Sequence, residues 1–205
     1  MKVLMLNGSP KSEGNTATAL AEMRAIFEKE EIEVDYVHVG HLSVRGCCAC
    51  GACSKLGKCA IDDVVNELSL KLEECDGIVI GSPVYYAALN GTLVSLLDRL
   101  FYSSRFDKRM KVAAGVVVAR RGGCSAAFDQ INKYFTISGM AVATSQYWNS
   151  VHGALPGQAS EDAEGLQTMR TLANNMAFLM KSIALGKEKY GLPEKEKLQR
   201  TNFIR

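Results

Sequence analysis

Five of the seven cysteines lie close together in one segment, between Cys47 and Cys59. Four of them, Cys47, Cys50, Cys53 and Cys59, form the pattern C-x2-C-x2-C-x5-C, and Cys48 is an additional thiol beside it. Three thiols spaced two residues apart, with a fourth nearby, can surround one small iron–sulfur cluster. Structural zinc sites usually pair two knuckles separated by a longer loop, so the compact spacing favours a cluster over zinc. Free thiols and a redox disulfide remain alternatives.

A second chemical pattern follows the first apolar run of the chain, residues 3–6. The loop over residues 8–16 places glycines, hydroxyls and a lysine between a strand and a helix, where free backbone amides favour phosphate. The candidate phosphate-binding residues are Ser9, Pro10, Lys11, Asn15 and Thr16. Asn15 could instead cap the helix that follows. The loop lacks the endings of a nucleotide P-loop, a dinucleotide fingerprint and a phosphatase loop, so we predict binding of a terminal monophosphate without hydrolysis.

Two further loops follow predicted strands and carry distinctive residues. In the first, a proline and aromatic rings form a flat apolar wall for a planar heterocycle, or alternatively pack under the next helix. Its residues are Pro83, Val84, Tyr85 and Tyr86. In the second of these loops, backbone amides and guanidinium groups could stabilise the negative charge of a reduced ring. Its residues are Ala119, Arg120, Arg121, Gly122 and Gly123.

The elements that must position these loops follow from the hydrophobic pattern. It predicts strands over residues 3–6, 32–39, 77–81, 112–119 and 140–145. Amphipathic helices are predicted over residues 16–29, 64–74, 90–101, 126–138 and 161–185. Five strands, each followed by a helix or a long crossover, predict a doubly wound parallel sheet. In such a sheet, ligands bind at the carboxyl ends of the strands, where the three loops begin.

The composition limits the class of protein. The chain has 205 residues, 47% of them hydrophobic and 22% charged, with a net charge of +2. The composition excludes a disordered or coiled-coil protein. The small net charge gives no excess of basic residues of the kind that binds nucleic acid. Because no signal peptide and no membrane-spanning stretch is evident, we expect a cytoplasmic protein without a membrane partner. In a reducing cytosol, clustered cysteines serve metal or redox chemistry more often than structural disulfides.

The chain is expected to form one domain over residues 1–185, with a cysteine-rich insertion over residues 45–62 after the second strand. The tail over residues 186–205 is polar and contains Gly191 and Pro193, which makes it a poor helix. Its apolar end, Phe203 and Ile204, could dock on another subunit.

Several conspicuous residues are predicted to support the fold. Cys75 and Cys124 are expected to pack as small hydrophobes, and Asp63 to cap the helix that follows it. The remaining group follows the fifth strand and could either line a substrate pocket or pack. It consists of Trp148, Asn149 and His152.

The three loops resemble those of a known family. The segments NGSPKSEGNT (residues 7–16), GSPVYY (residues 81–86) and LLDR (residues 96–99) are similar to the NADPH-dependent FMN reductase branch of the flavodoxin-like flavoproteins. The resemblance runs from residue 1 to about residue 153. It implies a sheet in the order 2-1-3-4-5, FMN phosphate on the first loop and the flavin ring between the other two. It also implies a homodimer or homotetramer, with the flavin near a subunit interface.

The cysteine segment carries a narrower resemblance. The runs CCACGAC (residues 47–53) and GKCAIDD (residues 57–63) resemble the compact motif of iron–sulfur flavoproteins, which bind a [4Fe–4S] cluster beside FMN. The resemblance implies electron transfer between FMN, a cluster and a donor or acceptor such as a ferredoxin. Cys48 is expected to be a spectator.

Two other functions remain open at this stage. A cluster-free NAD(P)H-dependent FMN, quinone or nitro reductase would stack nicotinamide on the flavin, which explains the lack of a separate dinucleotide fingerprint. A non-enzymatic binding domain on the same fold is the remote alternative. A receiver-like domain needs clustered aspartates after the first strand, and residues 7–9 provide none.

Overall fold

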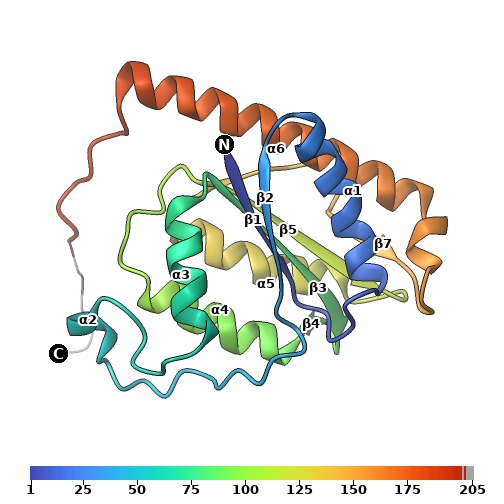
Figure 1. Cartoon of the computed structure of the whole chain (residues 1–205), viewed down its shortest axis with the longest axis horizontal. Coiled ribbons are helices and arrows are strands. Elements are labelled where there is room, and N and C mark those ends of the chain that lie inside the picture. Colours follow the sequence, from blue (N-terminus) through green and yellow to red (C-terminus); the bar gives the residue numbers. More distant parts are fainter. Residues whose placement is uncertain (200, 202–205) are drawn as a thin grey trace.

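The computed structural model describes residues 1–199 and 201, which form a parallel sheet between two layers of helices (Figure 1). The sheet has the order β2-β1-β3-β5-β6, with the short β4 antiparallel to β3 and β7 parallel to β5. The strands are β1 (Lys2–Asn7), β2 (Glu33–His38), β3 (Gly77–Tyr85), β4 (Ala88–Leu89), β5 (Val112–Ala119), β6 (Ala141–Val142) and β7 (Ser150–His152). The helices are α1 (Asn15–Lys29), α2 (Cys53–Leu56), α3 (Val64–Glu74), α4 (Gly91–Ser103), α5 (Cys124–Ile137) and α6 (Ala163–Tyr190), with a 3-10 turn over Gln158–Glu161.

The predicted doubly wound sheet is confirmed. Without the hairpin strand β4 and the added strand β7, β2-β1-β3-β5-β6 is the expected order 2-1-3-4-5, because β4 takes one number in the chain. The cysteine-rich segment follows β2, as expected.

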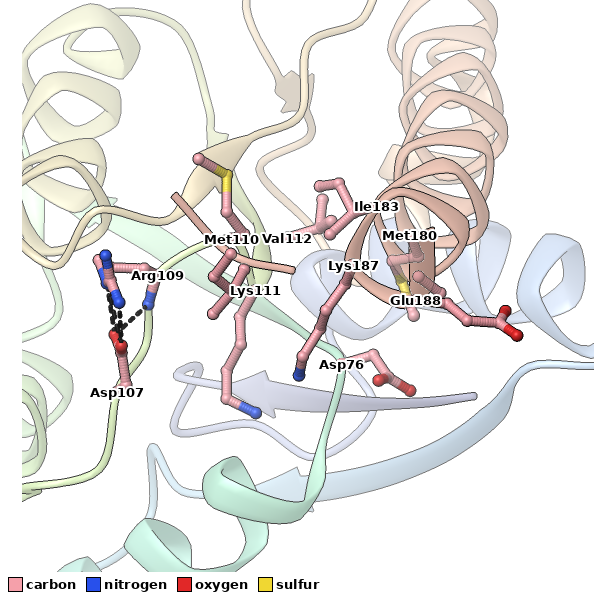
Figure 2. A pocket seen from close by; sticks show the side chains of 12 residues that line it. Asp76, Asp107, Arg109, Met110, Lys111, Val112, Met180, Ile183, Lys187 and Glu188 are labelled. Atoms are coloured by element: carbon pink, nitrogen blue, oxygen red, sulfur yellow. Dashed lines mark hydrogen bonds and ion pairs between the residues drawn. The ribbon is translucent and has the colours of Figure 1, made fainter. Parts of the chain in front are cut away.

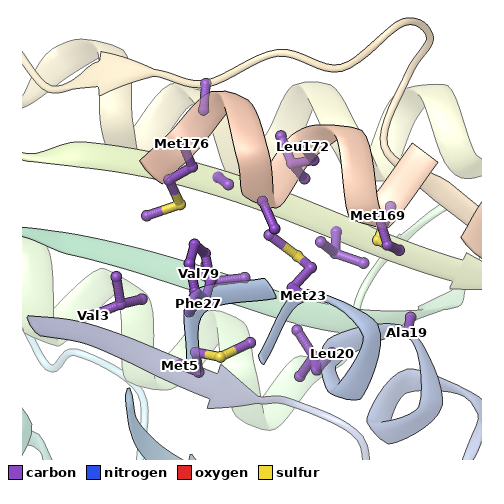
Figure 3. Close-up of a cluster of buried hydrophobic side chains, with 14 of the residues drawn as sticks. Val3, Met5, Ala19, Leu20, Met23, Phe27, Val79, Met169, Leu172 and Met176 are labelled. Atoms are coloured by element: carbon purple, nitrogen blue, oxygen red, sulfur yellow. The ribbon is translucent and has the colours of Figure 1, made fainter. Parts of the chain in front are cut away.

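The two faces of the sheet carry separate cores because side chains alternate along each strand. Val3 and Met5 of β1 face α1 and α6, whereas Leu4 and Leu6 face α3, α4 and α5. Figure 3 shows the first core, in which Phe27 of α1 lies among side chains of the sheet and α6. The methionines of α6 are core residues, and Cys75 is buried as predicted.

The fifth predicted strand, residues 140–145, is wrong in its extent. Only Ala141 and Val142 form β6, and the chain then leaves the sheet and returns as β7 to pair with the later part of β5. Asn149 causes the return, because its buried side chain donates to the Gly115 carbonyl at 3.1 Å. Its own carbonyl accepts from the Val117 amide at 3.0 Å. The sequence contains two short strands where one was expected.

The last helix was predicted to end at residue 185, and this boundary is also wrong. α6 continues through Gly186 to Tyr190, and the chain turns only at Gly191, which has a left-handed φ of 72°. Ion pairs from Arg170 to Glu22 and from Lys181 to Glu30 tie α6 along α1. Packing therefore overrides the low helix propensity of glycine. The apolar pair 203–204 lies outside the described residues.

Among the described residues, none belongs to a helix that is both long enough and apolar enough to cross a membrane.

We predict that two glycine substitutions shift stability in opposite directions. Gly186→Ala should raise the free energy of unfolding by about 0.5–1 kcal/mol, because the position is helical and a Cβ would meet open space. Gly115→Ala should lower it by about 1–3 kcal/mol, because its Cβ would lie 2.3 Å from Ile131 Cγ2. Urea denaturation measures both changes. A destabilised Gly186→Ala protein would contradict a continuous helix at this point.

Candidate functional site

A cavity of about 290 Å³ lies at the carboxyl edge of the sheet, where β1, β3 and β5 end side by side. The parallel register sets this edge: Asn7 pairs with Gly81, and Pro83 pairs with Val118. The three loops singled out from the sequence therefore face one space. The cavity is lined by Ser9, Lys11, Gly14, Asn15, Thr16, Pro83, Val84, Tyr85, Val118, Ala119, Arg120, Gly153, Ala154 and Pro156.

The first loop is held by hydrogen bonds from several elements. The Gly8 amide donates to the Gly81 carbonyl at 2.8 Å, and the Asn90 side chain donates to the Gly8 carbonyl at 2.8 Å. The Ser9 amide donates to Asn7 Oδ1 at 2.9 Å, while Ser9 Oγ accepts from the Lys11 amide at 3.1 Å. A loop fixed in this way presents its polar groups without reorganisation when a ligand binds.

Two residues of the β2 end close the back of this loop. His38 Nε2 lies 2.7 Å from the Ser9 carbonyl. Gly40 comes so close that a Cβ atom would lie 2.2 Å from the Ser9 carbonyl oxygen. Glycine is therefore required at residue 40 by close approach, and His38 supports the loop from behind.

The amino end of α1 points its free amides toward the cavity. Gly14 is the N-cap residue, and as a glycine it has no side chain that could accept a hydrogen bond from the first turn. The interpretation of Asn15 as a helix cap is therefore wrong. Its amide instead bridges to the opposite loop, donating to the Leu155 carbonyl at 3.0 Å and accepting from the Ala159 amide at 3.1 Å. An uncapped helix start beside Lys11 has the chemistry of a phosphate site.

The second loop is a tight hairpin. Tyr85 pairs with Ala88 across a two-residue turn formed by Tyr86 and Ala87, whose φ values are 50° and 59°. Positive φ at both central positions is the pattern of a type I′ turn, which glycine or asparagine normally occupies. Pro83, Val84 and Tyr85 line the cavity, whereas Tyr86 is fully exposed at the tip of the turn and lies outside the cavity lining.

The third loop packs against the second. Gly123, with a φ of 93°, approaches so closely that a Cβ atom would lie 2.9 Å from Ala87 Cα and 3.1 Å from Val84 Cγ1. It is also the N-cap of α5, which has no side-chain cap, so that helix start is a second set of free amides. Ala119 and Arg120 line the cavity.

The structure thus brings together most of the predicted ligand-binding residues. Those that line the cavity are Ser9, Lys11, Asn15, Thr16, Pro83, Val84, Tyr85, Ala119 and Arg120. Those outside the lining are Pro10, Tyr86, Arg121, Gly122 and Gly123. The sequence analysis missed Gly153, Ala154 and Pro156, which follow β7 at the same edge. The sequence shows a turn-forming stretch here, with Gly153, Pro156 and Gly157, but it does not show that the strand before it pairs with β5.

The residues left open after the fifth strand do not line this cavity. Asn149 is buried in the sheet, and Trp148 is exposed with its ring 5.1 Å from that of Tyr147. His152 Nε2 lies 3.9 Å from Cys124 Sγ. Burial raises the pKa of the Cys124 thiol, in keeping with its predicted packing role.

The cysteine segment forms a second candidate site on the outer side of α3 and α4 (Figure 1). One small cavity is lined by Cys47, Cys48, Cys50, Gly51, Cys53, Cys59, Ala60, Ile61, Arg99, Tyr102 and Ser103. Within residues 1–199 and 201, no three His, Cys, Asp or Glu side chains stand in an arrangement that could already hold a metal ion. The donor set nevertheless fits an iron–sulfur cluster, because all four predicted thiol ligands border the same cavity.

Arg99 also lines this second cavity, although the sequence analysis quoted it only as the last residue of the LLDR segment and gave it no role. Its guanidinium pairs with Asp63, at 2.6 Å from Nη1 and 2.8 Å from Nη2, and its Nε donates to Cys59 Sγ at 3.3 Å. Burial alone would raise the pKa of Asp63. The hydrogen bonds from Arg99 and the Val65 amide outweigh that effect and hold this pKa below its usual value. Asp63 also caps α3 as predicted, accepting from the Val65 amide at 3.1 Å.

Another cavity, of about 580 Å³, lies at the opposite edge of the sheet, beneath the end of α6 (Figure 2). Asp76, Lys111 and Lys187 border it, and the Arg109 and Asp107 side chains at its rim pair with each other. Lys111 Nζ already donates to the Glu73 carbonyl at 2.9 Å. This edge carries the amino ends of the strands, where open parallel sheets do not bind their ligands.

The fold and the three-loop cavity define a flavodoxin-like flavoprotein. Residues 1–154 match the model of the NADPH-dependent FMN reductases. The chain belongs to this family, which includes the iron–sulfur flavoproteins it resembles in sequence. It is a flavin-dependent oxidoreductase with FMN as its cofactor.

Among its relatives, an iron–sulfur flavoprotein of Methanocaldococcus jannaschii is 35% identical over 195 residues, which cover 89% of this chain and 99% of the relative. An iron–sulfur flavoprotein of Methanosarcina thermophila is 30% identical, with 92% and 100% covered. Among solved structures, RosB with a bound flavin intermediate superposes with a TM-score of 0.72 at 17% identity, covering 100% of this chain and 92% of RosB. The NAD(P)H:quinone oxidoreductase of Methanothermobacter marburgensis gives 0.67 at 14% identity, with 86% and 96% covered. These structural likenesses show the fold.

We predict that Asn15→Ala loosens the loop over residues 153–159. The substitution removes both hydrogen bonds of the bridge and should lower the free energy of unfolding by about 1–3 kcal/mol, at about 0.5–1.5 kcal/mol for each bond. Urea denaturation and the hydrogen-exchange rate of the Ala159 amide, which donates to Asn15, measure the effect. Asn174→Ala is the matched control, because that amide bonds only within its own helix. Equal effects of the two substitutions would contradict the bridging role.

Proposed function

We propose that this protein transfers electrons between FMN in the three-loop cavity and a [4Fe–4S] cluster in the cysteine segment. The observation that carries the proposal is the common cavity of five cysteines, on a chain whose relatives are named iron–sulfur flavoproteins. In this proposal residues 1–185 act as one FMN-binding domain, and residues 45–62 are the insertion that adds the second redox centre. Free thiols persist in a reducing compartment, so we propose the cytoplasm as its location.

The phosphate of FMN is proposed to bind at the first loop. Lys11 supplies a positive charge, Ser9 and Thr16 supply hydroxyls, and the uncapped start of α1 supplies free amides. Charge-assisted hydrogen bonds of this kind are stronger than neutral ones. The loop is already held by its own hydrogen bonds, so that little ordering would accompany binding.

The flavin ring is proposed to lie against the second and third loops. Pro83, Val84 and Tyr85 provide an apolar wall, and Arg120 provides a positive charge. When bound, FMN supplies one- and two-electron chemistry, and the protein supplies position and electrostatics. The residues around the ring would stabilise the negative charge that reduction adds.

The proposed ligands of the cluster are Cys47, Cys50, Cys53 and Cys59, with Cys48 as a spectator. A bound cluster would pass single electrons. The external partner is then a single-electron carrier such as a ferredoxin, or NAD(P)H acting through the flavin. We propose a homodimer or homotetramer as the working assembly.

A second candidate function is NAD(P)H-dependent reduction without a cluster, which the family description favours. Anaerobic purification followed by iron analysis and an absorption spectrum separates the two. FMN together with about four irons per chain supports the first function. A yellow protein that stays iron-free after reconstitution contradicts it and leaves the NAD(P)H-dependent reductase.

We predict that Lys11→Ala weakens FMN binding by about 10- to 100-fold, the loss expected for a hydrogen bond to a charged group. The affinity for riboflavin, which has no phosphate, should stay unchanged. Fluorescence titration of the apoprotein measures both affinities. Lys29→Ala, at the other end of α1, is the control. Equal losses for FMN and riboflavin would place Lys11 away from the phosphate.

We predict that Cys50→Ser and Cys53→Ser lose most of the bound iron while retaining FMN, because the two cavities share no residues. Cys48→Ser, which removes the spectator thiol, should retain both. Iron and flavin content per chain, measured after anaerobic reconstitution, give the result. Loss of FMN from the Cys50 and Cys53 variants would contradict the separation of the two sites.

A further inference from the structure

Arg99 stands out because a charged side chain occupies an apolar helix face. It lies on α4 among Leu96, Leu97 and Leu100, and its exposed fraction is 1%. Burying an arginine is costly unless its charge and its donors are all matched. The partners of Arg99 therefore indicate what its burial achieves.

All five N–H groups of Arg99 have acceptors, and every acceptor belongs to the cysteine segment or its exit. Nη1 donates to the Arg45 carbonyl at 3.1 Å and to Asp63. Nη2 donates to the Ile61 carbonyl at 3.1 Å and to Asp63. Nε donates to Cys59 Sγ. One guanidinium thus joins the beginning of the segment, its end and one of its sulfurs.

The rest of the segment has few such attachments. Most residues from 45 to 58 are exposed, and the only regular element between them is the single turn α2. A second anchor is Asn66 of α3, whose side chain accepts from the Cys59 amide at 3.0 Å and donates to the Cys59 carbonyl at 3.1 Å. Cys59 is consequently held on its backbone by Asn66 and at its sulfur by Arg99.

We propose that Arg99 is the positioning residue of the cysteine segment and that it raises the reduction potential of the cluster. Its guanidinium closes the two ends of the segment, so that the thiols border one cavity. Its Nε–H, aimed at Cys59 Sγ, favours the more negative reduced state, because hydrogen bonds to the sulfurs set the potential of such clusters. The effect on the potential rests on the proposed function, whereas the closing of the segment does not.

The test uses Arg99→Gln and Arg99→Lys. Arg109→Gln is the control, because Arg109 also pairs with an aspartate, Asp107, but does not line the cysteine cavity. In the metal-free, FMN-loaded protein, trypsin cleavage after Lys55 and Lys58 should be at least tenfold faster for both Arg99 variants. Arg99→Lys keeps the positive charge but cannot span the same acceptors. FMN content and circular dichroism establish that the rest of the fold is intact.

If Arg99→Gln does not fold, Asp63→Asn replaces it in the cleavage assay, because asparagine retains the cap on α3 while the charge pair is lost. Faster cleavage of that variant supports the positioning role. Cleavage at the wild-type rate in the folded variants overturns it.

In the iron-loaded protein, the reduction equilibrium of the cluster should shift about tenfold toward the oxidised form in both Arg99 variants. For one electron this corresponds to about 59 mV. A purely structural role would change iron content without shifting the potential of the loaded fraction. A wild-type potential in Arg99→Lys overturns the hydrogen-bond effect.

If the wild-type protein takes up no iron, the proposed function and the effect on potential both fail, and the cleavage rates alone decide the positioning role.

Discussion

The pairing of β3 with β1 on one side and β5 on the other is the constraint on which the three-loop cavity depends. It brings Gly8, Pro83 and Ala119 to the same edge, so that three loops far apart in the chain enclose one cavity. Two hydrogen bonds, from the Gly8 amide to the Gly81 carbonyl and from the Asn90 side chain to the Gly8 carbonyl, fix the first loop just beyond the end of β1. The cavity is therefore an extension of the sheet, and its geometry is set by backbone pairing.

Helix α4 links the two candidate sites. Asn90, at its start, caps the helix through the Thr92 amide and holds the phosphate loop through Gly8. Arg99, near its end, holds the cysteine segment. At a rise of 1.5 Å per residue, the two anchors are separated by about 14 Å along the helix axis. The leucines between them pack into the core beneath the sheet, so that one rigid element fixes the distance between the sites.

The sequence was sufficient for the parts of the fold that repeat a strong local pattern. The doubly wound parallel sheet and the position of α3 follow from apolar runs and helical spacing, and the three loops follow from the polar residues after them. The strand order came from the resemblance to the FMN reductases. The boundaries that failed depend on distant contacts. Asn149 returns the chain to β5 through Gly115, and α6 extends past Gly186 because it packs along α1. No local signal carries either effect.

The site residues divide in the same way. Ser9, Lys11 and Arg120 could be found because polar residues follow apolar strands. Asn15 was found, but its contact partner lies 140 residues later, so its bridging role could not be read from the sequence. Arg99 was quoted within the LLDR segment, but nothing in a leucine-rich helix showed that this arginine would be buried. Its five acceptors come together only when the segment before α3 folds over α4.

The long final helix has a consequence for how the chain acquires its structure during synthesis. The family match ends at residue 154, yet Met169, Leu172 and Met176 of α6 cover the apolar face of α1 and the central strands (Figure 3). A ribosome that has completed the cofactor loops has therefore produced a chain in which α1 alone covers this face of the sheet. Exposed apolar surface of this kind promotes aggregation. The nascent chain thus completes this core only when its last helix has emerged.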